Sequence, residues 1–365
     1  MSELMALQGY HHLEFYVGNA HQAAHYYRTA FGFTPIAYAG PETGVRDLAS
    51  YVLAQGDIRF VLTAGLRPDH EVVAHQGRHG DGVRDIAFAV ADAEVAFATA
   101  VERGAVPVLP PEVREDESGK VVVAAIGAYG ETIHSFVERG AYDGAFLPGY
   151  TALDDPGAVA DIGLRHVDHV VANVELGAMS RWARFYERIL GFSQLVHFDD
   201  EAISTEYTAL MSKVLWDGDG RVKLPINEPA PGRKRSQIDE YLEAYGGPGV
   251  QHMALATDDM VATVSALEAG GVRFLQVPDA YYDDLRDRLD WSRIDEDLDA
   301  LAAHGILVDT DDEGYLLQLF THPVQDRPTV FFEIIERHGS RGFGVGNFKA
   351  LFEAIEREQD SRGNL

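Results

Sequence analysis

The sequence contains an internal repeat, and this repeat restricts the possible folds more than any other feature. Residues 81–88 match residues 248–255, and each run is followed by a segment of helical character that ends in glycine. Near the end of each copy, residues 135–139 match residues 333–337. The repeat predicts two copies of one α+β unit, and the strand–helix–strand order within each copy is typical of paired βαβββ modules that close a curved sheet.

The beginning of each copy supports the same division. A strand is predicted up to Asn19, a favourable N-cap residue for the helix that follows and ends at Gly32. In the second copy a strand over residues 167–174 contains Asn173, which we place opposite Asn19. The helix after this second strand ends at Gly191, as the first helix ends at Gly32.

These boundaries predict two domains, in keeping with the rough prior of about 150 residues per domain for a chain of this length. We expect the N-terminal domain over residues 1–153 and the C-terminal domain over residues 160–365, with a linker at residues 154–157. Because 46% of the residues are hydrophobic, each domain has enough apolar side chains for a core of its own.

The composition argues against several kinds of site and partner. The chain has no cysteine, which excludes disulfides, thiolate metal sites, iron–sulfur clusters and a cysteine nucleophile, and is typical of a cytoplasmic protein. The net charge of −28 argues against nucleic acid or an anionic membrane as a partner. No apolar run approaches the roughly 20 residues that a membrane-spanning helix needs, so we expect no membrane insertion.

Residues 329–337 are rich in β-branched and aromatic side chains and predict a buried strand. Alternation along the strand places Glu333 on the same face as Phe331 and Ile335. A carboxylate between two large apolar side chains does not stay ionised unless it is paired or bound to a metal. Glu333 is therefore a member of a buried ion pair, a protonated acid or a metal ligand.

His169 and His252 also fall on predicted buried strands of the second copy. A single histidine on an apolar strand is usually a core residue, and this interpretation stays open for each one alone. Together with Glu333, the two histidines form a set that suits Fe(II) with open coordination positions, and that also permits Mn, Zn, Ni or Co. In the first copy we assign the counterparts of His169, His252 and Glu333 as Phe15, Asp85 and Ser135.

Two insertions and a tail distinguish the second copy. Residues 225–232 are expected to form a rigid proline-rich loop, and residues 281–304 a polar insertion with a short surface helix. After Gly346, Asn347 is expected to cap a helix that docks on the protein body or covers an opening. The apolar face of this helix would consist of Phe348, Leu351, Phe352 and Ile355.

Several segments of the chain closely resemble the 4-hydroxyphenylpyruvate dioxygenase family. In the first half they are residues 17–24 and 147–150, and in the second half they are residues 167–170, 205–207, 225–229, 236–238, 249–252, 314–320, 323–328 and 332–338, and the tail from residue 342 to residue 365. The likeness extends over nearly the whole chain. It implies the vicinal-oxygen-chelate fold, with a metal-free N-terminal barrel, a catalytic C-terminal barrel and a gating C-terminal helix.

The resemblance also implies a site. Its cofactor would be Fe(II), and the iron ligands would be His169, His252 and Glu333. The family's catalytic positions map to Gln237, Gln251, Gln318, Phe331 and Asn347, and its further substrate-binding positions map to Ser212, Asn227, Phe343 and Phe348.

The reaction implied by the resemblance converts 4-hydroxyphenylpyruvate and O2 to homogentisate and CO2, a step of tyrosine catabolism. It combines oxidative decarboxylation, ring hydroxylation and migration of the side chain, and a homo-oligomer (a dimer or a tetramer) is expected. One alternative is hydroxymandelate synthase activity, which hydroxylates the benzylic carbon of the same substrate. Another is a non-catalytic module of the same fold that sequesters a small molecule.

Overall fold

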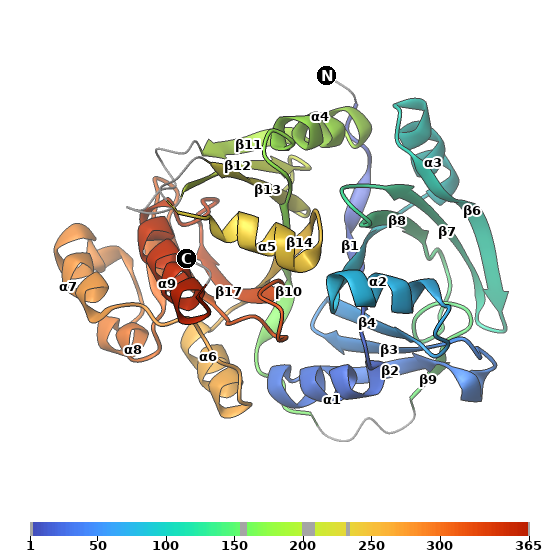
Figure 1. Cartoon of the computed structure of the whole chain (residues 1–365), viewed down its shortest axis with the longest axis horizontal. Helices are drawn as coiled ribbons and strands as arrows, with labels where there is room; N and C mark the ends of the chain where they lie inside the picture. The colour runs from blue at the N-terminus through green and yellow to red at the C-terminus, as the bar shows by residue number, and fades with distance from the viewer. Residues whose placement is uncertain (1–2, 154–158, 199–208, 231–233, 364–365) are drawn as a thin grey trace.

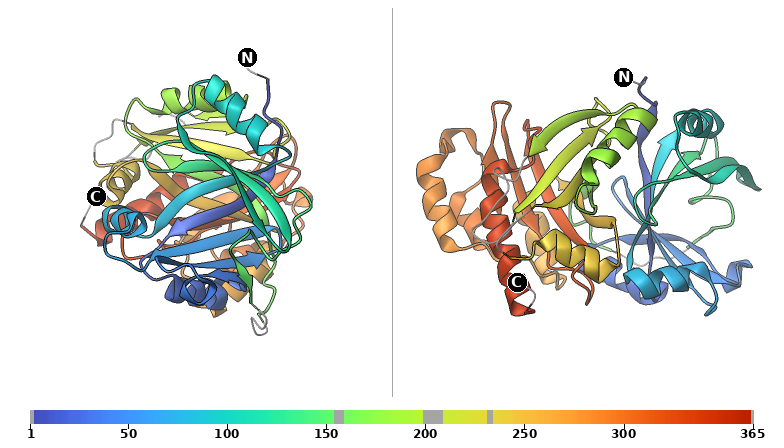
Figure 2. Two further views of the ribbon diagram at one scale, coloured as in Figure 1. Left: turned by 90° about the vertical axis from the view of Figure 1, so that its right-hand side faces the viewer. Right: turned by 45° about the horizontal axis from the view of Figure 1, so that its top comes forward.

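The computed structural model describes residues 3–153, 159–198, 209–230 and 234–363, so the linker expected at residues 154–157 lies outside the described residues. The chain forms two curled sheets with helices packed around them, and the two halves lie side by side (Figure 1 and Figure 2). The predicted α+β class with two tandem units is confirmed.

The N-terminal sheet is built from residues 7–152. Its strands are β1 (Leu7–Tyr16), β2 (Thr34–Ala39), β3 (Leu48–Gln55), β4 (Ile58–Gly65), β5 (Gly82–Val90), β6 (Pro107–Asp116), β7 (Gly119–Gly127), β8 (Ile133–Glu138) and β9 (Thr151–Ala152). They lie in the order β6-β7-β8-β5-β1-β4-β3-β2-β9. β1 pairs in parallel with β4 and antiparallel with β5, which places the first strand of the chain at the centre of the sheet.

The C-terminal sheet repeats this plan. Its strands are β10 (Leu164–Asn173), β11 (Ser193–Phe198), β12 (Ala209–Trp216), β13 (Lys223–Ala230), β14 (Gly249–Thr257), β15 (Leu307–Thr310), β16 (Tyr315–Phe320) and β17 (Phe331–His338). Their order is β11-β12-β13-β10-β14-β17-β16-β15. β10 pairs in parallel with β13 and antiparallel with β14, as β1 does with β4 and β5.

The helices pack around these sheets. They are α1 (Ala20–Phe31), α2 (Glu71–His79) and α3 (Ala93–Glu102) in the first half, and α4 (Met179–Ile189), α5 (Gln237–Tyr245), α6 (Met260–Ala269), α7 (Asp279–Arg288), α8 (Leu298–Ala303) and α9 (Phe348–Ser361) in the second. Single 3-10 turns lie at η1 (Pro41–Thr43), η2 (Trp291–Arg293) and η3 (Val345–Asn347). Within the described ranges, no helix is both long and apolar enough to cross a bilayer.

Local sequence signals explain where α1 begins and ends. The side chain of Asn19 accepts a hydrogen bond from the backbone N–H of Gln22 at 3.0 Å, so the predicted N-cap is confirmed. Gly32 ends the helix with φ of 69°, a left-handed conformation that glycine adopts without a steric penalty. The insertion expected at residues 281–304 contains α8, as predicted, and also most of α7.

The two halves share one apolar core. Phe332 on β17 points away from the interior of its own sheet and packs against the first half, with its ring 5.0 Å from that of Phe31 and 5.8 Å from that of Phe60. These three side chains are completely buried. Because alternate residues of a strand face opposite sides, this contact directs Phe331 and Glu333 into the C-terminal barrel.

Strand pairing corrects one assignment made from the sequence. The paired residues are Leu13 with Ile86 in the first sheet, and Val170 with Met253 in the second. His12 and His169 each lie one residue earlier and are therefore equivalent, so the assignment of Phe15 as the counterpart of His169 was wrong. That assignment placed Asn173 opposite Asn19, but Asn173 is the last residue of strand β10, and the next helix, α4, has Ala178 at its N-cap position.

The proline-rich loop expected at residues 225–232 was also wrong, because residues up to Ala230 belong to β13 in the middle of the sheet. Asn227 presents its carbonyl to the N–H of Val174 on the β10 side. Pro225 and Pro229 lie two residues away on either side, so their missing N–H groups face that same side. β13 pairs with β10 over only two residue pairs, so the prolines break no ladder hydrogen bond there.

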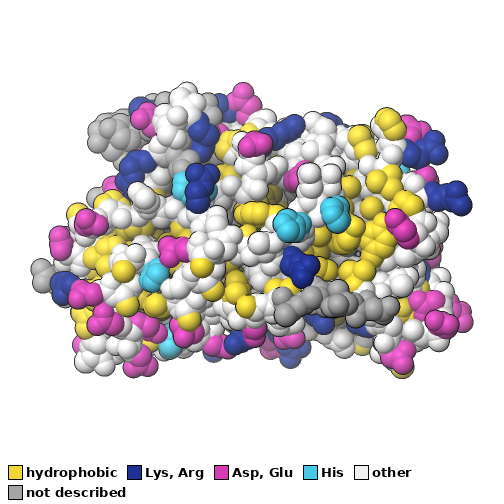
Figure 3. Space-filling view, turned by 90° about the horizontal axis from the view of Figure 1, so that it is seen from below, with side chains coloured by type: hydrophobic (Ala, Val, Ile, Leu, Met, Phe, Trp, Pro, Cys, Tyr) yellow, Lys and Arg dark blue, Asp and Glu magenta, His cyan; other side chains and the backbone are white. Residues whose placement is uncertain are grey.

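Charged side chains of both signs are scattered over the molecular surface. Figure 3 shows one face, on which acidic and basic side chains are interspersed with apolar patches and several histidines. Arg67 pairs with Asp69 and Arg286 with Asp299 in this exposed manner. Pairs of this kind contribute little to the free energy of unfolding, about 0–1 kcal/mol each, so the fold depends on its shared apolar core.

Candidate metal centre

Three side chains from adjacent strands converge inside the C-terminal sheet. His169 lies on β10, His252 on β14 and Glu333 on β17, and these strands are neighbours in the order of the sheet. Nε2 of His169 lies 3.1 Å, and Nε2 of His252 3.5 Å, from Oε2 of Glu333. All three residues are buried, and one donor atom of each lies within 4.8 Å of the others. The structure thus brings together the three residues singled out in the sequence.

Each histidine is oriented by the residue that precedes it on its own strand. Nδ1 of His169 lies 2.7 Å from Oδ1 of Asp168, and Nδ1 of His252 lies 3.0 Å from Oε1 of Gln251. These oxygens accept the Nδ1 proton, which turns Nε2 of each ring toward the Glu333 carboxylate. An outer hydrogen bond of this kind is what metal-binding histidines usually make, and it fixes both ring orientation and tautomer.

Asp168 is held in turn by two cations. The guanidinium of Arg337 donates to both carboxylate oxygens at 2.9 Å, and Nζ of Lys223 donates to Oδ2 at 2.7 Å. Burial opposes ionisation of Asp168, but the hydrogen bond with His169 and the charges of Arg337 and Lys223 outweigh it and hold the pKa well below its usual range. A charged Asp168 is therefore available to orient His169.

The ligand set has a charge pattern suited to a cation. Burial alone would raise the pKa of Glu333, but the positive charge of His169 and hydrogen bonds from both histidines lower it to about 2. Burial favours neutral His169, yet Glu333 and Asp168 prevail and raise its pKa. Burial lowers the pKa of His252. Without a metal, a proton on His169 compensates the Glu333 carboxylate, and a divalent cation would replace that proton.

The centre lies in the wall of a cavity enclosed by the C-terminal sheet. The Phe331 ring stacks on that of His252 at 4.8 Å, and the Phe343 ring meets the edge of His169 at 5.1 Å. The side chains that line the cavity include the three predicted ligands and seven further predicted site residues, which are Ser212, Asn227, Gln237, Gln251, Gln318, Phe331 and Phe343.

One predicted site residue lies outside the lining of the cavity. Asn347 is buried behind the lining, where its Nδ2 donates to Oε1 of Gln318 at 2.9 Å and its Oδ1 accepts from the hydroxyl of Tyr281 at 2.6 Å. Asn347 directly precedes α9, at the position predicted for the N-cap, and the capping hydrogen bond itself stays a prediction. Phe348 was also predicted to bind substrate, but its side chain lies outside the described part of the structure, as do those of Leu351 and Phe352.

Gln318 connects Asn347 to the ligands, because its Nε2 donates to Oε1 of Glu333 at 3.1 Å. One amide chain therefore links the carboxylate to η3, directly before α9. The helix itself reaches the cavity through Ile355, which is part of the lining. The tail helix docks on the body of the protein, as the sequence indicated, and packs against α5 in the C-terminal half (Figure 1).

Sequence reasoning missed several contributors. Val171, Leu210, Val214, Pro225 and Phe320 also line the cavity, and nothing distinguishes them in sequence from ordinary core residues. Asp168 and Arg337 were missed as well, although they meet across 169 residues of chain. A signal was present, because a charged residue directly before a candidate ligand on a buried strand needs a partner of opposite charge.

Comparison with known proteins bears on both halves. Residues 166–319 match the family described as the Glyoxalase/Bleomycin resistance protein/Dioxygenase superfamily. Residues 2–147 match the family described as Hydroxyphenylpyruvate dioxygenase, HPPD, N-terminal.

Curated relatives match along the whole length. A 4-hydroxyphenylpyruvate dioxygenase from Aspergillus fumigatus is 49% identical over 100% of this chain and 96% of its own. One from Dictyostelium discoideum is 49% identical over 98% of this chain and 100% of its own. The chain belongs to the 4-hydroxyphenylpyruvate dioxygenase family. Another member of this dioxygenase family, from Xenopus tropicalis, is 47% identical over 98% of this chain and 92% of its own.

A solved structure supports the fold of the dioxygenase family for both halves. A triple mutant of 4-hydroxymandelate synthase from Streptomyces coelicolor superposes with a TM-score of 0.87 and 34% identity, over 97% of this chain and 100% of that one. The predicted vicinal-oxygen-chelate architecture of two tandem barrels is therefore confirmed.

Proposed function

We propose that this protein is an Fe(II)-dependent 4-hydroxyphenylpyruvate dioxygenase, which converts its substrate and O2 to homogentisate and CO2. The observation that carries the proposal is the convergence of His169, His252 and Glu333 in the cavity wall. The relatives with 47–49% identity carry the name of this dioxygenase, whereas the hydroxymandelate synthase structure is 34% identical.

The donor set fits ferrous iron. Two imidazoles and one carboxylate, all buried, form the combination typical of non-haem Fe(II) oxygenases that keep coordination positions open. His169, His252 and Glu333 would hold the ion, and Asp168 and Gln251 would keep the two rings in place. When bound, Fe(II) supplies the redox chemistry toward O2 that protein side chains lack.

The cavity suits an aromatic 2-oxo acid. Phe331, Phe320 and Phe343 offer flat apolar surfaces for a phenol ring, close to both histidines. We assign them the role of holding the ring and excluding water. Besides the ligands, the polar side chains of the lining are neutral, so a bound anion would obtain its compensating charge from the metal. These neutral polar residues are Ser212, Asn227, Gln237, Gln251 and Gln318.

Neutral amides have a second advantage beside an oxidising centre. They donate and accept hydrogen bonds without titrating near neutral pH, so they can orient both the phenol and the oxo acid. Gln318 is the residue best placed to link substrate and ligands, because it bonds to Glu333 and Asn347 together. We therefore infer that Gln318 positions the substrate relative to the carboxylate ligand.

The tail would act as the gate of the site. Arg337 bonds to Asp168 and also donates to the backbone carbonyls of Gly342 at 2.7 Å and Ser340 at 3.3 Å. The same buried cation therefore braces an outer partner of the metal and the segment that leads into α9. Opening of α9 would admit substrate, and closure would keep water out during the reaction.

The decisive test is the identity of the product. Anaerobically purified protein is mixed with Fe(II), 4-hydroxyphenylpyruvate and O2, and the aromatic product is identified by mass and NMR. Homogentisate is the expected product. If the product is hydroxymandelate, the chain has hydroxymandelate synthase activity instead. If iron is retained and no product forms, an enzymatic role is contradicted.

We further propose that the protein is cytoplasmic and forms a homo-oligomer, a dimer or a tetramer. The absence of cysteine supports the first point, because nothing in the chain requires an oxidising compartment. Light scattering coupled to size-exclusion chromatography would measure the mass of the assembly against the 40.1 kDa chain, and a mass equal to one chain would contradict the second point.

A further inference from the structure

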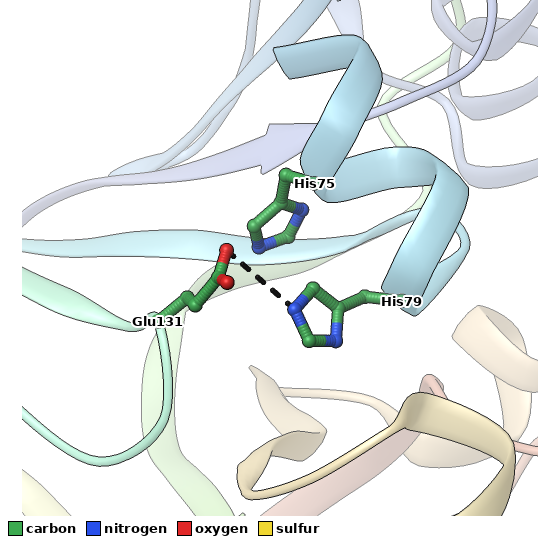
Figure 4. Close-up of side chains that lie close together, drawn as sticks. All are labelled: His75, His79 and Glu131. Carbon is green, nitrogen blue, oxygen red and sulfur yellow. Dashed lines mark ion pairs between the residues drawn. The ribbon is translucent and has the colours of Figure 1, made fainter. Parts of the chain in front are cut away.

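A second group of potential metal ligands lies in the N-terminal half, outside both barrels. His75 and His79 are one turn apart on α2, and Glu131 lies in the connection between β7 and β8. One donor atom of each residue lies within 4.8 Å of the others. Figure 4 shows both rings projecting from the helix toward the Glu131 carboxylate.

The histidines of this group lack hydrogen-bond partners that buried imidazoles normally have. Both ring nitrogens of His75 and Nε2 of His79 are buried and make no hydrogen bond with the described residues. The two residues are 2% and 5% exposed. An unpaired buried polar atom costs about 1–3 kcal/mol, and three such atoms in one small volume indicate that a ligand is missing.

The orientation of His79 is that of a metal ligand. Its Nδ1 lies 2.6 Å from the backbone carbonyl of Tyr245, at the end of α5 in the other half of the molecule. The carbonyl can only accept, so Nδ1 carries the proton and Nε2 presents a lone pair. Nε2 lies 3.5 Å from Oε2 of Glu131. His169 in the catalytic centre has the same arrangement, with an acceptor at Nδ1 and a carboxylate at Nε2.

The surroundings of His75 favour the neutral form that metals require. Burial is the main cause that lowers the pKa of His75 to about 3, and the nearby charges of Arg84 and Arg78 act in the same direction. Its ring packs edge-on against Tyr16 at 5.2 Å, a contact that uses none of its nitrogens. Both ring nitrogens, one with a proton and one with a lone pair in the neutral ring, therefore make no hydrogen bond in the packing of the fold.

One cation competes for the carboxylate. Arg78 pairs with Oε1 of Glu131 and donates to Oε2 at 3.2 Å, but its side chain is 60% exposed. An exposed guanidinium can withdraw from one oxygen and keep the other, whereas the two histidines are fixed by packing. Removing Arg78 should therefore strengthen metal binding at this group, whereas removing any of the three potential ligands should weaken it.

We propose that His75, His79 and Glu131 form a binding site for a divalent transition-metal ion of the zinc type, at the seam between the two halves. Two imidazoles at positions i and i+4 of a helix, with one carboxylate, are typical zinc donors, and water completes the coordination. A bound ion would tie α2 to the β7–β8 connection and, through Tyr245, brace the junction with α5.

Zinc content measured on the folded protein tests the site. Wild-type protein is dialysed against Zn2+ buffered at micromolar free concentration, and bound zinc is counted by mass spectrometry. We expect His75→Gln and Glu131→Gln each to hold one zinc fewer per chain than wild type, with unchanged circular dichroism. His25→Gln, which removes an exposed histidine on α1, serves as the control and should keep the wild-type content.

A second variant separates a metal site from a merely structural cluster. Arg78→Gln removes the competing charge, so zinc affinity at this site should rise roughly fivefold, the upper range for one exposed ion pair. Zinc should also raise the Tm of wild type more than that of Glu131→Gln. Wild-type zinc content in His75→Gln or Glu131→Gln, or weaker binding in Arg78→Gln, would overturn the proposal.

Discussion

At equivalent positions on their inner faces, the two barrels carry different side chains. Three positions that share strand geometry are occupied by His169, His252 and Glu333 in the C-terminal barrel, and by His12, Asp85 and Ser135 in the N-terminal barrel. Only the first set combines two imidazoles with one carboxylate, the combination that suits Fe(II), whereas the second set offers one imidazole, one carboxylate and one hydroxyl.

The N-terminal set satisfies its own hydrogen bonds. The backbone N–H of Ser135 donates to Oδ1 of Asp85 at 3.0 Å, and the Ser135 hydroxyl donates to Oδ2. Nδ1 of His12 lies 2.7 Å from Nδ1 of His11, so a second histidine stands where the C-terminal barrel has a carboxylate. In the N-terminal barrel these polar groups are therefore hydrogen-bonded to one another.

The interior of the N-terminal barrel is filled by side chains, whereas that of the C-terminal barrel contains the cavity. In the N-terminal barrel, Val123 stands where the other barrel has Gln318, and Phe146 packs its ring 5.2 Å from that of His12. An apolar cluster that includes Val52, Val61 and Phe146 fills this interior. In the C-terminal barrel the corresponding space is the cavity. A duplicated fold thus supplies the positions, and the side chains decide whether a barrel binds or only packs.

Replacing a ligand should have the largest effect. Glu333→Ala removes the carboxylate from the centre, so bound Fe(II) and turnover should fall by at least about a hundredfold, beyond the usual cost of an outer partner. Ser135→Ala at the equivalent position of the other barrel is the control and should retain both. Iron analysis and product assays on the two variants measure this, and unchanged iron content in Glu333→Ala would refute the assigned ligand.

Loss of the outer carboxylate should have the next largest effect. Asp168→Asn weakens the hold on His169 and leaves Arg337 without its charged partner, so Fe(II) affinity should fall roughly 10- to 100-fold. His11→Asn changes the equivalent position of the N-terminal barrel and should leave the affinity unchanged. Equal losses in both variants, measured by metal titration, would show that the effect is one of general stability.

Fe(II) affinity should depend on pH through the histidines. Metal and proton compete for His169, whose pKa is raised in the folded protein because Glu333 and Asp168 overcome the effect of burial. As pH falls through that pKa, affinity should drop by about tenfold per pH unit, one proton being displaced per ion. Because the pKa of Glu333 is about 2, its titration does not contribute to the pH dependence of Fe(II) affinity above pH 5. A flat affinity between pH 5 and 8 would contradict histidine ligation.

The N-terminal barrel should show pH dependence in stability instead. Burial, opposed by the bonds from Ser135, raises the pKa of Asp85 to about 7, against about 3.9 for the unfolded chain. The folded state therefore binds the extra proton, and the stability due to Asp85 is lost as pH rises from about 4 to about 7. Asp85→Asn should flatten this decline in urea unfolding at unchanged turnover, and an unchanged slope would contradict it.

The sequence predicted the features that depend on local pattern. Asn19 and Gly32 bound a helix as expected, and the match of residues 81–88 with 248–255 placed His252 opposite Asp85. Glu333 stood out because a carboxylate on an apolar strand needs a partner, and the structure supplies His169 at 3.1 Å. These inferences required only the periodicity of strands and the cost of burying a charge.

What the sequence could not predict depends on distant contacts. Arg337 and Lys223 meet at Asp168 from different strands, and no spacing in the chain predicts that meeting. Pro225 misled the assignment of β13, because the effect of a missing N–H depends on which neighbour the strand faces and over what length. The alignment of one repeat on the other likewise depends on strand pairing and β-bulges, which the sequence does not show. For this reason His12 was overlooked as the counterpart of His169.

Anomalous diffraction at the iron edge, from crystals loaded anaerobically with Fe(II), would locate the bound iron. We expect a strong peak between His169, His252 and Glu333, and none between His12, Asp85 and Ser135. An iron peak inside the N-terminal barrel, or no peak at the C-terminal ligands in protein that turns over substrate, would contradict the division of roles between the two barrels.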